Sequence, residues 1–99
     1  MGFKMEISTQ SNTISIVGNI KSISDFQTIK ENTDLIIKEH KNISIQIIDS
    51  LSITSSVIGY FTKLVLKDKI AIHMYIGNVQ LMSLLEDLNL VSTFNATKA

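Results

Sequence analysis

The sequence predicts an α/β fold, with a mixed, mostly parallel sheet and an antiparallel hairpin at its start. Two short runs that alternate apolar and polar residues, 3–8 and 13–17, flank a polar turn, as in a β-hairpin. Two further β-branched runs, 43–49 and 70–76, are each preceded by apolar residues at helical spacing. Strands that alternate with helices form a parallel sheet with right-handed crossovers. The expected order is β-β-α-β-α-β-α-(β), with helices on at least one face.

The first helix is expected over residues 24–40. Ser24 and Gln27 have the spacing of a capping box, which favours a helix start at this point. The helix is expected to end near His40 and Lys41, whose positive charge suits the negative end of the helix dipole. The predicted buried side recurs at helical spacing: Phe26, Ile29, Thr33, Ile36, Ile37 and His40.

The second half of the chain contains two more helices. The continuous apolar run 70–76 predicts a strand that is covered on both faces. Asn78 is a candidate cap for the third helix, and Asn89 tolerates the left-handed conformation that often ends one. The expected buried side of this helix is Val79, Met82, Leu85 and Leu88. A last strand is predicted over 90–94, followed by a loose tail at 95–99.

Length and composition limit the class of protein. The 99 residues fit one domain, 1–99, with a core over about 3–94. The formal net charge of zero argues against a nucleic-acid-binding protein, which usually has a basic face. There is no cysteine for a disulfide or a metal site, and no apolar run approaches the ~20 residues of a membrane span. A cytoplasmic protein without direct membrane insertion is therefore expected.

Three hydroxyl residues, Thr54, Ser55 and Ser56, lie where the third strand gives way to the second helix. Such residues are favoured at helix starts because their oxygens accept hydrogen bonds from unpaired backbone N–H groups. A hydroxyl there also lies beside the positive end of the helix dipole, which suits a phosphate of about −1.5 to −2 charge. The pattern alone leaves two interpretations open: helix caps only, or a phosphoacceptor.

The segment T54-S-S-V-I-G59 resembles the signature turn of the STAS domain family, D-S-S-G-[LI]-G followed by an apolar helix. The chain departs from that signature at Thr54, where the family has an acidic residue, and at Val57, where it has glycine. Gly18 resembles the glycine that follows the family's second strand, and N89-L-V-S-T-F94 resembles its G-L-x-x-x-F ending. The resemblance covers residues 3–94.

The resemblance implies a small, single-domain regulator of the anti-sigma factor antagonist type, which acts in bacterial partner switching. It implies that a serine protein kinase of the anti-sigma type phosphorylates Ser56, and that a PP2C-like phosphatase removes the phosphate. The unphosphorylated form would bind the kinase partner, and the phosphorylated form would release it. The output would be a sigma factor, and hence transcription regulation, or a biofilm or secretion pathway. The alternative is a constitutive STAS subunit of a membrane transporter complex.

In either case the protein would be a binding partner, not an enzyme, without cofactor or metal. Asp49 and Ser50 form a rival aspartate–serine pair, which ranks lower because no glycine or helix face follows at the right distance. His40 and His73 are the only histidines, and each fits a helix or strand pattern as a structural residue. The surface expected to bind the partner consists of Thr54, Ser55, Val57, Gly59, Lys63, Asn19 and Ser22.

Overall fold

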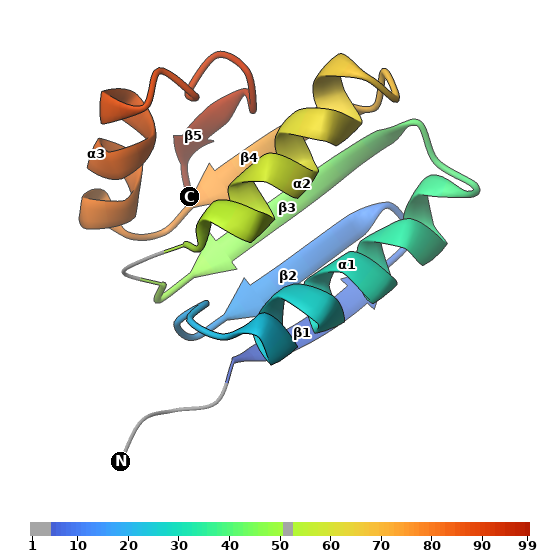
Figure 1. The fold of residues 1–99 in the computed structure, drawn as a ribbon, viewed down its shortest axis with the longest axis horizontal. Coiled ribbons are helices and arrows are strands. Elements are labelled where there is room, and N and C mark those ends of the chain that lie inside the picture. Colours follow the sequence, from blue (N-terminus) through green and yellow to red (C-terminus); the bar gives the residue numbers. More distant parts are fainter. Residues whose placement is uncertain (1–4, 51–52) are drawn as a thin grey trace.

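The computed structural model describes residues 5–50 and 53–99, and over these residues it confirms the predicted α/β class and element order (Figure 1). Residues 3 and 4 of the predicted first strand lie outside the described residues. In chain order the elements are β1 (Glu6–Gln10), β2 (Thr13–Val17), α1 (Ile23–Ile37), β3 (Asn42–Ile48), α2 (Ser55–Leu66), β4 (Ala71–Ile76), α3 (Val79–Asp87) and β5 (Ala96–Lys98).

The strands form one mixed sheet in the order β1-β2-β3-β4-β5. β1 pairs antiparallel with β2, as the predicted hairpin requires, and the other pairs are parallel. Each helix therefore connects two neighbouring parallel strands. Right-handed crossovers between successive neighbours place their helices on the same face of a sheet. Figure 1 shows α1 and α2 lying across one face of the sheet, with α3 beside β4 and β5.

The core lies between this face and the helices. Alternate residues of β2, β3 and β4 are buried and form one cluster with the inward sides of the helices. Phe61 of α2 packs edge-on against Phe94, with ring centroids 6.4 Å apart, and both rings are fully buried. The central strand residues of the cluster are Ile14, Ile16, Ile43, Ile45, Ile47, Ile72, Met74 and Ile76.

The opposite face of the sheet has no helix on it among the described residues, so the prediction that 70–76 is covered on both faces is wrong. His73 and Tyr75 are half-buried on this open face, whereas Ile72 and Met74 beside them are buried. Sequential strand order is the physical reason, because it leaves all the crossovers on one side. The rings of His73 and Tyr75 stack on each other, with centroids 4.7 Å apart.

The start of α1 differs from the prediction, because its cap is Ser22 rather than Ser24. The Ser22 hydroxyl accepts from the Asp25 N–H at 3.0 Å, and the Asp25 carboxylate accepts from the Ser22 N–H at 3.2 Å. Aspartate thus fills the capping-box position that was assigned to Gln27. The helix ends at Ile37, so His40 and Lys41 lie beyond its last turn, although the Lys41 ammonium donates to the Ile37 carbonyl at 3.4 Å.

The end of the chain also differs from the prediction. Asn78 caps α3, and Asn89 is left-handed with φ 58°, both as predicted. Residues 90–94 form turns rather than a strand, while 96–98, predicted to be loose, pair with β4 as β5. The buried Phe94 side chain anchors these turns and brings the following residues alongside β4. On α3 the buried residues are Leu81 and Leu85, whereas Val79 and Leu88 are exposed.

Tyr60 joins α2 to α1. Its hydroxyl donates to the Asp34 carboxylate, which also accepts from the Lys30 ammonium at 2.8 Å, and its ring lies edge-on to Phe26 with centroids 6.2 Å apart. Burial acts to raise the pKa of Asp34, but the hydrogen bonds from Lys30 and Tyr60 outweigh it and hold that pKa below 3.8. Burial and the bond to Asp34 both raise the pKa of Tyr60, so the phenol remains a donor.

Tyr60→Phe is expected to lower the free energy of unfolding by about 0.5–1.5 kcal/mol at neutral pH, because it removes one partly buried hydrogen bond. Since the folded pKa of Asp34 lies below its ordinary value, the stabilisation is present above pH 3.8 and is lost as the pH falls below it. Urea unfolding of wild type and variant at neutral pH and well below pH 3.8 measures both effects. An equal difference at the two pH values would contradict the assigned hydrogen bond.

Within residues 5–50 and 53–99, no helix has the length and apolar character needed to cross a bilayer.

Candidate functional site

The candidate site lies at the edge of the sheet where β2, β3 and β4 end. These strands are parallel, so their carboxyl ends share one edge, and the helix that follows each strand begins there (Figure 1). Two loops, 18–22 and 49–54, lead from β2 to α1 and from β3 to α2. Residues 51 and 52 of the second loop lie outside the described residues. We refer to this edge, with its loops and helix starts, as the carboxyl edge.

A buried hydroxyl holds the two loops together. The Ser50 side chain is fully buried and donates a hydrogen bond to the Gly18 carbonyl. The Gly18 N–H donates to the Ile48 carbonyl at 3.1 Å, and its φ of 96° is a conformation that side chains rarely permit. Ser50 is thus a structural residue, which agrees with its lower rank as a phosphoacceptor. The tie places the loop that carries Asn19 and Ser22 beside the loop that leads to Ser56.

Thr54 is the N-cap of α2. Its hydroxyl oxygen accepts from the Val57 N–H at 3.3 Å, and its carbonyl accepts from the Ile58 N–H at 3.1 Å. Threonine therefore performs a capping role at the position where the STAS signature has an acidic residue. The first turn of α2 contains no acidic residue, so the positive end of its dipole has no nearby carboxylate within the turn.

Ser55 and Ser56 are exposed at the first two positions of α2. Neither hydroxyl forms a hydrogen bond with any of the described residues, whereas the hydroxyls of Thr54 and Ser50 both do. The Ser56 oxygen is thus open to solvent at a helix start. A phosphoacceptor requires such an accessible hydroxyl, and the Ser56 hydroxyl, unlike that of Thr54, is not engaged as a helix cap.

The remaining predicted residues of α2 divide between two faces of the helix. Gly59 and Lys63 are exposed and follow Ser56 at helical spacing on one side, with Lys63 about 10 Å further along the axis. A Cβ at Gly59 would meet nothing within 4 Å, so the glycine is not needed for packing within the protein and leaves the helix backbone bare. Val57, by contrast, is fully buried, so its side chain lies in the core beneath the predicted partner surface.

Asn19 and Ser22 lie on loop 18–22, which the hydrogen bond from Ser50 to the Gly18 carbonyl holds beside loop 49–54. Ser22 is exposed, and its hydroxyl is engaged as the α1 cap. Asn19 is half-buried and takes part in an interaction of its own. The structure therefore brings the predicted residues of both loops to one edge, with Lys63 furthest from it.

Sequence reasoning missed two exposed aliphatic residues at this edge. Ile23 and Val79 occupy the first positions of α1 and α3, and their exposed fractions are 76% and 69%. Because α2 starts between α1 and α3 along the sheet, they lie on either side of Ser55 and Ser56. Each of these residues immediately follows the capping Ser or Asn of its helix. The first helical position after a cap faces outward here, so this pattern could have indicated exposed aliphatic side chains at the edge.

The histidines lie elsewhere. His73 is on the open face of the sheet, and His40 follows the far end of α1. Among residues 5–50 and 53–99 there is no group of three or more His, Cys, Asp or Glu side chains placed to hold a metal ion. The chemistry that the carboxyl edge offers is thus that of an accessible hydroxyl beside a helix dipole.

No protein-family model matches this sequence, and no curated protein matches it.

Proposed function

We propose that this protein is a STAS-type partner-switching regulator whose state is set by phosphorylation of Ser56. The observation that carries the proposal is the exposed, unbonded hydroxyl of Ser56 at the second position of α2. Its neighbours are fixed, because Thr54 caps the helix and Val57 anchors it in the core. A kinase can therefore reach this oxygen on a rigid surface.

Phosphorylation at Ser56 leaves the fold intact. A negative charge in the first turn interacts favourably with the helix dipole, and no carboxylate in that turn opposes it. In a complex the same charge acts differently. A partner packed closely over Ser56 and the bare backbone at Gly59 would bury the dianion without a counter-ion, which costs several kcal/mol.

The partners are a serine protein kinase of the anti-sigma type and a PP2C-like phosphatase, both in the cytoplasm. The unphosphorylated protein holds the kinase partner and so frees the factor that this partner restrains. That factor is a sigma factor or a component of a biofilm or secretion pathway. The protein itself acts as substrate and binding partner, without catalysing a reaction.

Phosphate-affinity gels and intact mass of the protein recovered from cells of its source organism test the proposal. The wild type is expected to show a second species heavier by one phosphate, and Ser56→Ala is expected to lack it. Ser55→Ala is the matched control, one residue away and equally exposed, and is expected to keep the second species. A phosphorylated Ser56→Ala protein, or loss of the species in Ser55→Ala alone, would move the acceptor to another residue.

The second candidate function is a constitutive STAS subunit of a transporter complex. The exposed Ile23 and Val79 at the carboxyl edge favour it, since the centre of a permanent interface is more apolar than the rest of a surface. A permanent subunit would co-purify with a membrane permease whatever the charge at residue 56. A switch protein would exchange partners when that charge changes.

A further inference from the structure

The open face of the sheet carries two rows of polar side chains. The strand register aligns Ser8 with Ser15, Ser15 with Gln46 and Gln46 with Tyr75 in one row. The neighbouring row consists of Gln10, Thr13, Ser44 and His73. Both rows lack charged residues, and their lining consists of hydroxyl and amide groups with the aromatic His73–Tyr75 pair at one end.

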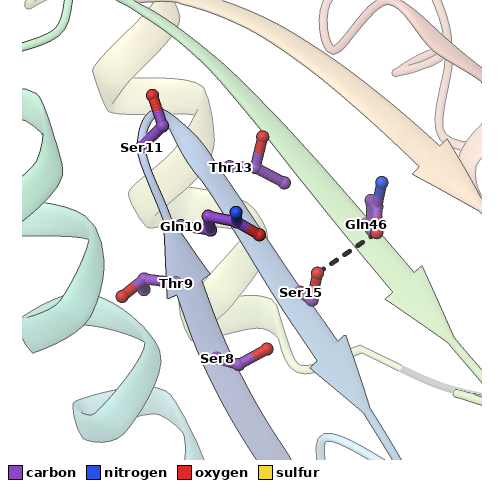
Figure 2. Close-up of a pocket in the computed structure, with 7 residues that line it drawn as sticks. All are labelled: Ser8, Thr9, Gln10, Ser11, Thr13, Ser15 and Gln46. Atoms are coloured by element: carbon purple, nitrogen blue, oxygen red, sulfur yellow. Dashed lines mark hydrogen bonds between the residues drawn. The ribbon is translucent and has the colours of Figure 1, made fainter.

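Part of this face is hollowed. A hollow of about 480 Å³ lies at the β1–β2 side of the open face. Figure 2 shows its side chains on β1, β2, β3 and the β1–β2 turn, with Thr9 directed toward α1 and with Ser15 and Gln46 joined by a hydrogen bond. The residues that line it are Ser8, Thr9, Gln10, Ser11, Thr13, Ser15 and Gln46. Ligand sites in proteins commonly occupy about 300–1,000 Å³, so the volume suffices for a small ligand.

The hydrogen bond between Ser15 and Gln46 fixes the orientation of the amide. The Ser15 hydroxyl donates to Gln46 Oε1 at 3.1 Å, so both N–H donors of the Gln46 NH₂ group are left unused by this bond. Each hydroxyl of the lining both donates and accepts, and the Gln10 amide does the same through two atoms. The hollow therefore presents paired donors and acceptors at close spacing.

The absence of charge in the lining determines which ligand chemistry fits. A phosphate or carboxylate would need a cationic partner, and a nucleic acid would need a basic face, but the seven lining residues are all neutral. A second copy stacked sheet on sheet would need interdigitating apolar side chains. The open face has Val17 and Ile48 at the end of the sheet away from the hollow, whereas the hollow itself offers only Ser, Thr and Gln. Vicinal hydroxyl groups match closely spaced donors and acceptors, and the stacked rings of His73 and Tyr75 provide an adjoining apolar surface.

We propose that this hollow binds a neutral, polyhydroxylated ligand, a mono- or disaccharide. The hollow is at the end of β2 opposite Gly18, and on the face of the sheet opposite α2. A bound sugar therefore leaves Ser56 accessible, and the proposal does not depend on the switch function.

Titration of the full chain with glucose, galactose, maltose and trehalose at millimolar concentrations, followed by amide NMR shifts, tests the proposal. At least one of these sugars is expected to give saturable shifts centred on the amides of Ser8, Thr13, Ser15 and Gln46. Gln46→Leu keeps the size of the side chain but removes its polar atoms, and is expected to weaken binding at least about tenfold. Ser15→Ala, which frees the Gln46 amide to rotate, is expected to weaken it as well.

Ser44→Ala is the matched control, because Ser44 is half-buried on the same face and strand as Gln46 but outside the hollow. It is expected to bind the sugar like wild type, and the dispersed spectrum of each variant reports its fold. Absence of saturable shifts with all four sugars, or shifts that centre away from the hollow, would overturn the proposal. So would saturable binding of glucose 6-phosphate or a single-stranded oligonucleotide at the hollow in place of neutral sugars.

Discussion

Ser56→Asp is expected to bind the proposed kinase partner about a hundredfold more weakly than Ser56→Ala, a difference of roughly 3 kcal/mol. The exposed position of Ser56 on a helix start lets a partner pack directly over it when the side chain is neutral. A carboxylate placed there would lose its water on binding without gaining a counter-ion. A pull-down with both variants as baits identifies the partner, and calorimetry with the purified partner measures the difference.

Ser55→Asp is the control, because it adds the same charge one residue earlier on the same turn of α2. A smaller loss of affinity in Ser55→Asp would show that the effect belongs to position 56 rather than to net charge. Circular dichroism should find both aspartate variants folded, since acidic residues suit a helix start. Equal affinity of Ser56→Asp and Ser56→Ala for the partner would refute the switch.

Val57→Gly is expected to lower the free energy of unfolding by about 2–4 kcal/mol. Val57 is fully buried, and removing a buried valine side chain costs about 1.5–3 kcal/mol, to which a helical glycine adds roughly 0.5–1 kcal/mol. The substitution introduces the glycine of the STAS signature that residues 54–59 resemble, so it also tests whether this chain folds stably with that signature's residue at position 57. Urea denaturation followed by circular dichroism measures the change.

Gly59→Ala in the same helix is the matched control, with the opposite expected sign. Open space surrounds the position of its Cβ, so the methyl group meets no steric conflict and the variant is expected to gain about 0.5–1 kcal/mol. A destabilised Gly59→Ala protein, or a Val57→Gly protein as stable as wild type, would contradict the assigned faces of α2.

The elements with strong local signals were predictable from the sequence. Residues 13–17 and the helix that ends at 66 were placed correctly, because alternation and helical spacing are properties of the segments themselves. The cap at Asn78 and the left-handed Asn89 followed from side-chain chemistry within a few residues. A hydroxyl cap among residues 54–56 was also predictable, and the structure assigns it to Thr54. The mixed sheet followed from the order of the elements.

Features that depend on distant residues were not predictable. β5 has three residues and little apolar character, and it forms because the buried Phe94 brings it beside β4. The open face of β4 follows from the order of all five strands, which a seven-residue run does not encode.

The candidate site divides in the same way. A helix start with serines was evident from the sequence, and the exposure of Ser56 agrees with that interpretation. The burial of Val57 depends on the orientation of α2 about its own axis relative to the sheet, which the residues of the turn alone do not determine. The hydrogen bond from Ser50 to the Gly18 carbonyl joins residues 32 positions apart, so the local sequence around either residue does not predict it.

The strand order has a consequence for how the protein is made. Every strand pairs with the strand synthesised just before it, so none has to insert between two that are already paired. The sheet can therefore grow outward from the hairpin as the chain leaves the ribosome. Each helix is synthesised directly after one strand and before the next, so it can cover the sheet as each strand is added. Little apolar strand surface then stays exposed until a segment much later in the chain has been synthesised. This order protects the nascent chain from aggregation.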